Sequence, residues 1–393
     1  MKLNKTKWKQ RTVAAILVGL LAGCAGEEDT IQVSPLPEVV SSFTPKALWD
    51  AEVGGGVENY YSKLSPIYAY DKIFAAAREG EVAALDPSTG EVIWALDLNV
   101  ANIFNISGGL TAAYDRLFFG TEAGELVAID AETGDLLWRV DVGGEVLSKP
   151  LADENLVIVH TSKGDLAAFD GNTGEQRWRV ATDVPNLTLR GDSSPSSAGG
   201  GVFWGMANGR LGAAFIGNGN VIWQQPIGVP KGASEIDRLV DIDAKPLVVG
   251  TTLFTIGYNG QLVAIDLRSG QVIWKRNYSG TNDLAIEGET LYFSNDQDVI
   301  YAVDARSGTE LWSNNALKHR QLTAPAIIDG YLVLGDAEGY LHWLDSSTGD
   351  FVAQQEFDSS GFAVPPIQVG SDFLATTRNG ELHLQSINDE VEL

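Results

Sequence analysis

The sequence predicts an all-β protein, an eight-bladed β-propeller with four antiparallel strands in each blade. Three observations predict this fold. A short motif recurs eight times along the 393 residues, six copies place a tryptophan at the same position, and further strand-like segments precede each copy. A period of about 40–45 residues with roughly four strands per period is typical of propeller blades.

The motif is clearest in residues 124–138, which read GELVAIDAETGDLLW. Residues 126–129 suit a pleated strand, and residues 136–138 begin a return strand. Asp130 is placed to accept backbone N–H bonds where the turn begins, and Gly134 tolerates the positive φ that the turn requires. The motif therefore predicts a hairpin of two strands.

Three positions of the motif recur through the chain. The leading residue is Gly80, Gly124, Gly164, Gly209, Gly260, Asp298, Gly339 and Gly380. The turn aspartate is Asp86, Asp130, Asp170, Asp266, Asp304 and Asp345, with Phe215 and Ser386 in the other two copies. The tryptophan is Trp94, Trp138, Trp178, Trp223, Trp274 and Trp312. These indoles are predicted to pack between neighbouring blades and to donate their N–H to a carbonyl.

The seventh and eighth copies lack this tryptophan. In the seventh, Ala353 takes its place, and we expect Phe351 or Phe357 to compensate; the sequence does not decide between them. For the eighth, residues 46–50 (KALWD) resemble residues 92–95 (VIWA), with Trp49 at the place of Trp94. We therefore expect the N-terminal strand to join the last blade and close the ring.

Two further strands are predicted ahead of each motif. The nearer one is evident at residues 72–75, 116–119, 156–159 and 331–334. The other often follows a proline, as after Pro66, Pro150 and Pro325. With these strands the predicted propeller covers residues 43–393.

The chain is strongly acidic. It contains 27 lysines and arginines and 52 aspartates and glutamates, which gives a net charge of −25. Binding to nucleic acid or to anionic lipid headgroups requires clustered basic residues. The charge therefore argues against both kinds of partner and serves mainly solubility.

Residues 1–23 have the pattern of a signal peptide, with a basic start and an apolar run over residues 13–21 that is too short to span a membrane. The tetrapeptide LAGC ends at Cys24 and resembles the lipobox of bacterial lipoproteins. The resemblance implies cleavage before Cys24 and lipid attachment to it, and Ala25 implies sorting to the outer membrane. The alternative is an ordinary signal peptide with an incidental cysteine. Residues 24–42 are then the lipidated cysteine and a flexible tether, and the propeller lies on the periplasmic face.

A search for chemistry finds no phosphate loop, nucleophile elbow or zinc-binding helix. His342 and His383 share one place in adjacent copies, but Ala83 and Val127 stand there in others, which indicates a strand position rather than a metal site. The Asp-x-x-Thr/Ser-Gly segments resemble acidic calcium loops, although their recurrence at hairpins favours turn capping. We therefore predict no catalytic residue, no metal and no cofactor.

The repeat resembles that of the pyrroloquinoline-quinone dehydrogenases, which also have eight blades docked by tryptophans. Those enzymes usually carry an adjacent cysteine pair near the quinone, whereas Cys24 is the only cysteine of this chain. The resemblance therefore extends to the fold and not to the cofactor. A quinone-dependent dehydrogenase-like enzyme and a periplasmic propeller that binds glycans or peptides remain the alternatives to a scaffold.

The two longest insertions in the repeat indicate where a partner binds. They contain residues 185–195 and 231–246, and each precedes the first strand of a blade, so we expect them on the same face of neighbouring blades. The leucines offer apolar contacts beside an arginine, and the two aspartates are expected to accept from basic groups or to hold that arginine. A loop network without a partner is the alternative. The candidate residues are Leu187, Leu189, Arg190, Asp241 and Asp243.

From the lipobox to the C-terminus the chain resembles the BamB family, the propeller lipoproteins of the outer-membrane β-barrel assembly (BAM) machinery. The stretches that carry the resemblance are residues 187–191, 235–239, 266–276, 335–343 and 358–362. The resemblance implies that the two loops meet the periplasmic POTRA domains of BamA. It also implies a non-enzymatic scaffold that assists folding and insertion of β-barrel proteins, whose other partners are further BAM subunits and unfolded outer-membrane proteins.

Overall fold

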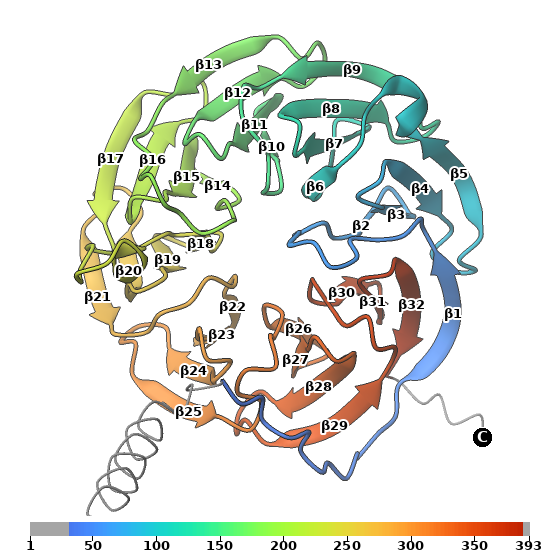
Figure 1. The fold of residues 1–393 in the computed structure, drawn as a ribbon, viewed down its shortest axis with the longest axis vertical. Helices are drawn as coiled ribbons and strands as arrows, with labels where there is room; N and C mark the ends of the chain where they lie inside the picture. Colours follow the sequence, from blue (N-terminus) through green and yellow to red (C-terminus); the bar gives the residue numbers. More distant parts are fainter. Residues whose placement is uncertain (1–30, 388–393) are drawn as a thin grey trace, which may run out of the picture. The chain divides into compact units, whose positions relative to one another are not determined.

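The repeats fold into eight four-stranded antiparallel sheets, which stand as blades around a central channel (Figure 1). The computed structural model describes residues 31–387. Within that range the chain is all-β apart from two short 3₁₀ helices, η1 (Leu98–Ala101) and η2 (Ile236–Arg238). No helix of the described residues is both long and apolar enough to cross a membrane. The predicted fold class is confirmed.

Each blade begins at the channel and runs outward through consecutive hairpins. The strands nearest the channel are β2 (Ile67–Ala69), β6 (Ile106–Ala113), β10 (Leu151–Asp153), β14 (Ser196–Ala198), β18 (Leu247–Val249), β22 (Ala285–Glu287), β26 (Ala326–Ile328) and β30 (Ile367–Val369). The second strands are β3 (Lys72–Ala76), β7 (Arg116–Thr121), β11 (Leu156–His160), β15 (Gly201–Gly205), β19 (Thr252–Ile256), β23 (Thr290–Ser294), β27 (Tyr331–Gly335) and β31 (Asp372–Thr376).

The motif itself forms the outer half of each blade. Its first strand is β4 (Glu81–Leu85), β8 (Glu125–Asp130), β12 (Leu166–Asp170), β16 (Arg210–Phe215), β20 (Leu262–Asp266), β24 (Ile300–Asp304), β28 (Tyr340–Asp345) or β32 (Glu381–Ser386). The outermost strands are β5 (Val92–Asp97), β9 (Leu136–Asp141), β13 (Gln176–Val180), β17 (Val221–Pro226), β21 (Val272–Arg276), β25 (Glu310–Asn314), β29 (Phe351–Glu356) and β1 (Lys46–Glu52).

The turn aspartates cap the hairpins, as the motif predicts. Asp130 Oδ1 accepts the backbone N–H groups of Glu132 at 2.8 Å and Thr133 at 2.9 Å. Gly134 then adopts a φ of +79°, which a residue with a Cβ adopts only under strain. Because these carboxylate oxygens are occupied by backbone donors, the Asp-x-x-Thr/Ser-Gly segments act as turns.

The ring closes between the two ends of the described chain. β1 pairs antiparallel with β32, from Lys46 opposite Ser386 to Glu52 opposite Glu381. The eighth blade is therefore β30–β31–β32–β1. In Figure 1 the blue first strand lies against the red last strand. The predicted closure by the N-terminal strand is confirmed.

Tryptophans dock the blades on one another. Trp274 on β21 donates its indole N–H to the carbonyl of Ala305 in the next blade at 2.9 Å, and Trp49 does the same to Pro87 at 2.9 Å. Each indole also lies on the glycine of the next blade's hairpin turn. A Cβ on Gly134 would approach the Trp94 ring to 2.8 Å, so only glycine permits this contact.

Blade seven lacks the outer tryptophan. Contrary to our expectation, neither Phe351 nor Phe357 replaces it. In six other blades the outer tryptophan faces an alanine across the strand pair, as Trp94 faces Ala84. In blade seven the pair is exchanged, with Trp343 on β28 facing Ala353 on β29. Because β32 and β1 are not joined by a turn, the eighth blade presents no turn glycine for an indole on β29.

The exchanged indole is fully buried among aromatic rings of both chain ends. Trp343 packs edge-on against Phe43 at 5.5 Å and against Phe373 at 5.0 Å between ring centroids. Edge-to-face pairs of this kind add to the stabilisation from burial. Trp343 therefore supplies the compensation, and Phe43 brings the N-terminal segment into the same core.

Part of the segment that we predict as a tether is bound to the propeller. Ser34 N–H donates to the carbonyl of Lys318 at 2.9 Å, and Ser42 N–H donates to that of Val352 at 2.8 Å. Residues 34–42 thus run along blade seven before β1 begins (Figure 1). Cys24 and the predicted signal peptide lie outside the described residues.

The core lies between blades rather than at one centre. In the part of the chain that the structure describes, buried apolar residues form eight clusters, most of which unite side chains of adjacent blades. One cluster combines Phe118 and Leu126 of blade two with Val157 and Phe169 of blade three. Burial of these facing surfaces stabilises the ring.

Trp138→Ala should destabilise the fold by about 3–5 kcal/mol, because it removes a large side chain that packs between blades two and three. The measurement is urea unfolding followed by tryptophan fluorescence or circular dichroism. Trp138→Phe is the matched control: the indole N–H has no acceptor among the described residues, so a retained ring should preserve most of the stability. Equal unfolding curves for wild type and Trp138→Ala would contradict the docking role.

Candidate partner-binding surface

The two insertions meet on one side of blades four and five, as the sequence predicts. The first precedes β14 and the second precedes β18. Leu189 N–H donates to Asp241 Oδ1 at 2.9 Å, and the Ser193 hydroxyl donates to the carbonyl of Ala244 at 3.0 Å. These two bonds tie the loops into one surface, which we call the loop pair (residues 185–195 and 231–246).

The first loop presents the predicted apolar and basic groups to solvent. Leu187 is 43% exposed, the Arg190 side chain is 48% exposed, and Leu189 is partly buried. A hollow of about 210 Å³ lies beside them, lined by Leu189, Arg190, Glu145 and Leu147 among others. The surface therefore combines apolar contact, a guanidinium and a concavity.

Arg190 is held by glutamates and not by the aspartates that we predict as its partners. Its Nη2 lies 3.2 Å from Glu122 Oε2 and its Nη1 lies 3.7 Å from Glu145 Oε2. Asp241 and Asp243 are 1% and 4% exposed, so their carboxylates face the interior beneath the loops. They support the loop pair instead of presenting charge to a partner.

Glu122 also links Arg190 to the first blade. It accepts two hydrogen bonds from Arg78, from Nε at 2.9 Å and from Nη2 at 2.9 Å. The Arg78 guanidinium in turn lies over the Tyr60 ring, 3.7 Å from its centroid. A fork of this geometry fixes the glutamate more firmly than a single bond does, so Arg190 stands in a pre-arranged setting.

Beneath the loops lies a buried carboxylate cluster made of Asp192, Asp241 and Asp243. Burial raises the pKa of Asp241 to about 7, and the neighbouring Asp243 raises it further in the same direction. Burial also raises the pKa of Asp243 and of Asp192. Lys63 is the nearby cation, and its Nζ donates to the Asp243 carbonyl at 2.9 Å.

His342 and His383, which occupy the same place in adjacent copies of the motif, contact different partners. His342 is fully buried, with Nε2 2.9 Å from Asp336 Oδ2 and Nδ1 3.2 Å from Gln354. Arg320 Nε donates to the same Asp336 oxygen at 2.7 Å. This network is internal to blade seven and the loop before it, which agrees with the structural interpretation of the histidine position.

One group among the described residues has the composition of a cation site. Ligand atoms of Asp358, Glu381 and His383 lie within 4.8 Å of one another. His383 Nδ1 is also 2.7 Å from Asp50 Oδ1 on β1, and its Nε2 is 3.5 Å from Glu381 Oε2. The hydrogen bond between His383 and Asp50 links β32 to β1 across the ring closure, which gives these side chains a structural role.

Comparison with known proteins identifies the family. The family model described as "Outer membrane protein assembly factor BamB" matches residues 78–314 and 295–390. The BamB of Vibrio cholerae is 60% identical over 378 residues, which is 96% of this chain and 98% of that protein. The chain belongs to the BamB family. The BamB of Escherichia coli K12 is 40% identical, covering 93% of this chain and 96% of that protein.

Solved structures agree with the BamB fold. The crystal structure of BamB from Moraxella catarrhalis has a TM-score of 0.78 at 28% identity and covers 87% of this chain and all of that one. Quinohemoprotein alcohol dehydrogenase from Comamonas testosteroni has a TM-score of 0.70 at 13% identity, covering 89% of this chain and 77% of that one. At that identity the likeness to the dehydrogenase concerns the fold alone.

Sequence reasoning missed the groups that set up this surface. Glu122 and Glu145 come from blade two and the loop after it, and Lys63 comes from the segment before blade one. Nothing in their local sequence separates them from the many other charged residues. Asp192 carries a weak signal, because it directly follows the candidate loop residues Arg190 and Gly191.

The loop pair should make stability depend on pH. Because the pKa of Asp241 is raised to about 7 in the folded protein and is near 4 when unfolded, the folded state binds the extra proton. The stability that Asp241 contributes is therefore greatest below about pH 4 and is lost as the pH rises through 7. Asp241→Asn keeps a side-chain oxygen that accepts the Leu189 N–H. It should reduce the pH dependence of stability only in part, because Asp192 and Asp243 remain.

The measurement is the free energy of unfolding in urea at about pH 5 and pH 8, for wild type and Asp241→Asn. Asp135→Asn, which changes an exposed carboxylate in a hairpin turn, is the control and should leave the wild-type slope unchanged. An identical slope for wild type and Asp241→Asn would contradict the assignment.

Proposed function

We propose that this outer membrane protein assembly factor acts as a non-enzymatic scaffold that binds the periplasmic POTRA domains of BamA through the loop pair. The single observation that carries the proposal is the grouping of exposed Leu187 and Arg190 with partly buried Leu189 above a buried, hydrogen-bonded base. By holding the POTRA domains, the propeller assists the folding and insertion of β-barrel proteins at the outer membrane.

Family membership supports the assembly role. The relatives named as BamB match this chain almost from end to end, at 60% identity in Vibrio cholerae and 59% in Aliivibrio fischeri. The two matches cover 96% and 95% of this chain, so the similarity to proteins with this role concerns nearly all of its residues. What we propose is the means by which the chain takes part in outer membrane protein assembly, namely as a scaffold.

The energetics of the loop pair support partner binding. Interfaces gain most of their affinity from a few anchors, among which arginine is enriched, and a partly buried leucine beside a hollow adds apolar contact. The bond from Leu189 N–H to Asp241 holds the loop in place before binding, so less entropy is lost on association. Arg190 is able to exchange its pairs with Glu122 and Glu145 for a partner carboxylate at its exposed edge.

The non-enzymatic part of the proposal rests on the sequence of the chain. Its only cysteine is Cys24, so it lacks the adjacent cysteine pair of the quinone-dependent enzymes that it resembles in fold. Buried Asp241 accepts the backbone N–H of Leu189, which gives it a structural role at the candidate surface. This arrangement suits a rigid docking surface.

We further propose attachment to the outer membrane, on its periplasmic face, by lipid on Cys24. The predicted tether of residues 24–42 is bound to the propeller over part of its length, from Ser34 to Ser42. Several acyl chains on one residue give stable anchoring. The propeller is thereby kept near its partner.

Arg190→Ala should weaken binding of the chain to purified POTRA domains by about 2 kcal/mol, close to 30-fold in Kd. Alanine is preferred to glutamate here, because a third carboxylate beside Glu122 and Glu145 would strain the loop. The measurement is isothermal titration calorimetry at fixed salt. A weaker affinity of Arg190→Ala would indicate that the Arg190 guanidinium contacts the POTRA domains.

Arg177→Ala is the matched control for this test. Arg177 is 45% exposed and pairs with Asp170 and Glu175, but it lies on the outermost strand of blade three. It should bind with the wild-type affinity. Equal affinities of wild type, Arg190→Ala and Arg177→Ala would show that the docking site lies elsewhere. If the wild-type protein does not bind, the enzyme and the ligand-binding propeller become the alternatives again.

Cys24→Ser should release the protein from the outer membrane, because serine offers no thiol for acylation. Cell fractionation followed by mass spectrometry of the N-terminal peptide measures the outcome. Wild type should co-sediment with outer membranes and carry the mass of its acyl groups. Membrane retention of the serine variant in cells without BamA would show another means of attachment.

A further inference from the structure

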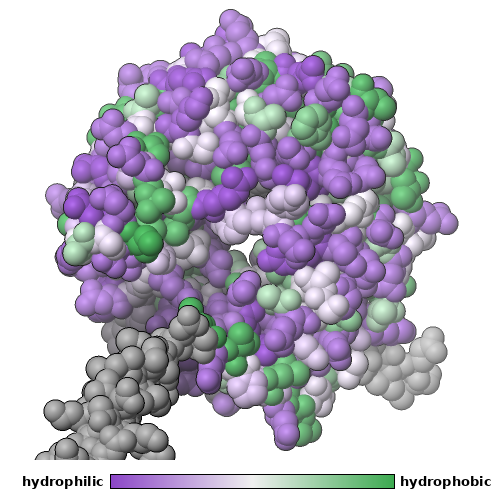
Figure 2. All heavy atoms as spheres, viewed as in Figure 1, coloured by the Kyte–Doolittle hydropathy of each residue, from purple (hydrophilic) through white to green (hydrophobic). Residues whose placement is uncertain are grey.

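A cavity of about 380 Å³ occupies the centre of the ring. Residues from all eight blades line it, most of them just before the innermost strands, where prolines such as Pro150 and Pro195 begin the blade. Figure 2 shows the opening at the centre of the ring, with a largely hydrophilic rim. The size lies within the range of small-molecule sites, about 300–1,000 Å³.

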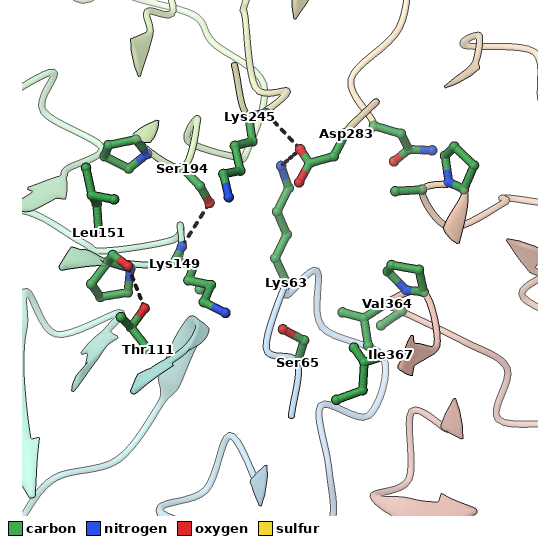
Figure 3. Close-up of a pocket in the computed structure, with 18 of the residues that line it drawn as sticks. Lys63, Ser65, Thr111, Lys149, Leu151, Ser194, Lys245, Asp283, Val364 and Ile367 are labelled. Atoms are coloured by element: carbon green, nitrogen blue, oxygen red, sulfur yellow. Dashed lines mark hydrogen bonds and ion pairs between the residues drawn. The ribbon is translucent and has the colours of Figure 1, made fainter. Parts of the chain in front are cut away.

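The wall of this cavity is basic in a strongly acidic protein. Three lysines line it, Lys63, Lys149 and Lys245, against a single carboxylate, that of Asp283. The whole chain carries a net charge of −25, so a local excess of cations is contrary to its composition. Figure 3 shows the Lys149 and Lys245 side chains directed toward the open centre, whereas Lys63 reaches toward Asp283.

The one carboxylate is already engaged by Lys63 and by the backbone. Lys63 Nζ lies 3.8 Å from Asp283 Oδ1 and donates to the Asp243 carbonyl. The same Asp283 oxygen accepts the backbone N–H of Lys245 at 2.8 Å. Within residues 31–387 neither Lys149 nor Lys245 has a carboxylate within 4.0 Å of its ammonium group.

The charge of Lys245 disfavours the charge of Lys149. Burial, and after it the charge of Lys245, lowers the pKa of Lys149 to about 8. The partly buried ammonium group of Lys149 has no carboxylate partner among the described residues, which costs free energy that a bound anion would return. Ser194 adds a hydroxyl, since its oxygen accepts from Lys149 N–H at 3.1 Å and its proton is left to donate.

Apart from the polar residues Ser65, Thr111 and Asn282, the rest of the wall is mainly apolar. Leu151, Val364 and Ile367 project into the cavity together with several prolines (Figure 3). A fully hydrated inorganic ion would leave this part of the wall without a contact. A ligand with an anionic head and an apolar body matches both halves of the wall.

We propose that the central cavity binds a small organic anion, with a carboxylate or phosphate held between Lys149 and Lys245 and an apolar body against Leu151, Val364 and Ile367. The site includes Ser194 and Lys245 at the inner ends of the loop pair, but it does not include the exposed Leu187 and Arg190. Ligands of this class match the charge, the volume and the mixed lining of the cavity.

Calorimetric titration of the full chain with phthalate and with phenyl phosphate tests the proposal, and phthalamide is the neutral control of the same shape. We expect at least one of the two anions to bind with a Kd below about 1 mM and phthalamide not to bind. The preferred anion identifies the head group as carboxylate or phosphate. No binding of either anion at about 10 mM, or equal binding of phthalamide, would overturn the proposal.

Lys245→Met and Lys149→Met should each weaken anion binding by about tenfold or more, because each removes one charge-assisted bond. Lys275→Met, on the exposed outer strand β21, is the matched control and should bind as wild type does. Lys245 is itself exposed toward the cavity, so its replacement tests the site even where Lys149→Met impairs folding. Unchanged affinity in Lys245→Met, with its melting temperature retained, would refute the assignment.

Discussion

The contact between an indole and a glycine is the constraint on which the ring depends. At seven blade interfaces the outer tryptophan lies on the glycine of the next hairpin turn, as Trp138 lies on Gly174. That glycine meets two demands at once, a positive φ for the turn and the absence of a Cβ under the ring. Because one short motif carries both partners, repeating the motif is sufficient to stack blades.

Closure of the ring requires a different device, since the last blade is assembled from both ends of the described chain. No hairpin turn joins β32 to β1, so the indole of blade seven moves across the strand pair to Trp343. Phe43 packs against it, and His383 pairs with Asp50 beside the new strand pair. Ladder hydrogen bonds, aromatic packing and a side-chain hydrogen bond thus replace the covalent turn.

The closed ring gives both proposed sites a rigid base. The loop pair rests on buried Asp241 and Asp243, and Lys63 connects the backbone of Asp243 to the wall of the central cavity. Exposed side chains on such a base lose little freedom when a partner binds. The cavity wall is equally fixed, because its residues directly precede the innermost strands of the blades. Both proposed sites therefore lie on segments that precede the innermost strands of the blades.

The sequence by itself determined the number of blades, the hairpin turns, the closing strand and the segment that holds the candidate surface. These features depend on local alternation, on turn chemistry and on repeat spacing, all of which are written along the chain. The tertiary structure alone decided that Arg190 pairs with Glu122, that Asp241 faces inward and that lysines of separate blades share a cavity. Those outcomes depend on which distant residues the ring brings together, and local sequence does not encode the direction of a loop side chain.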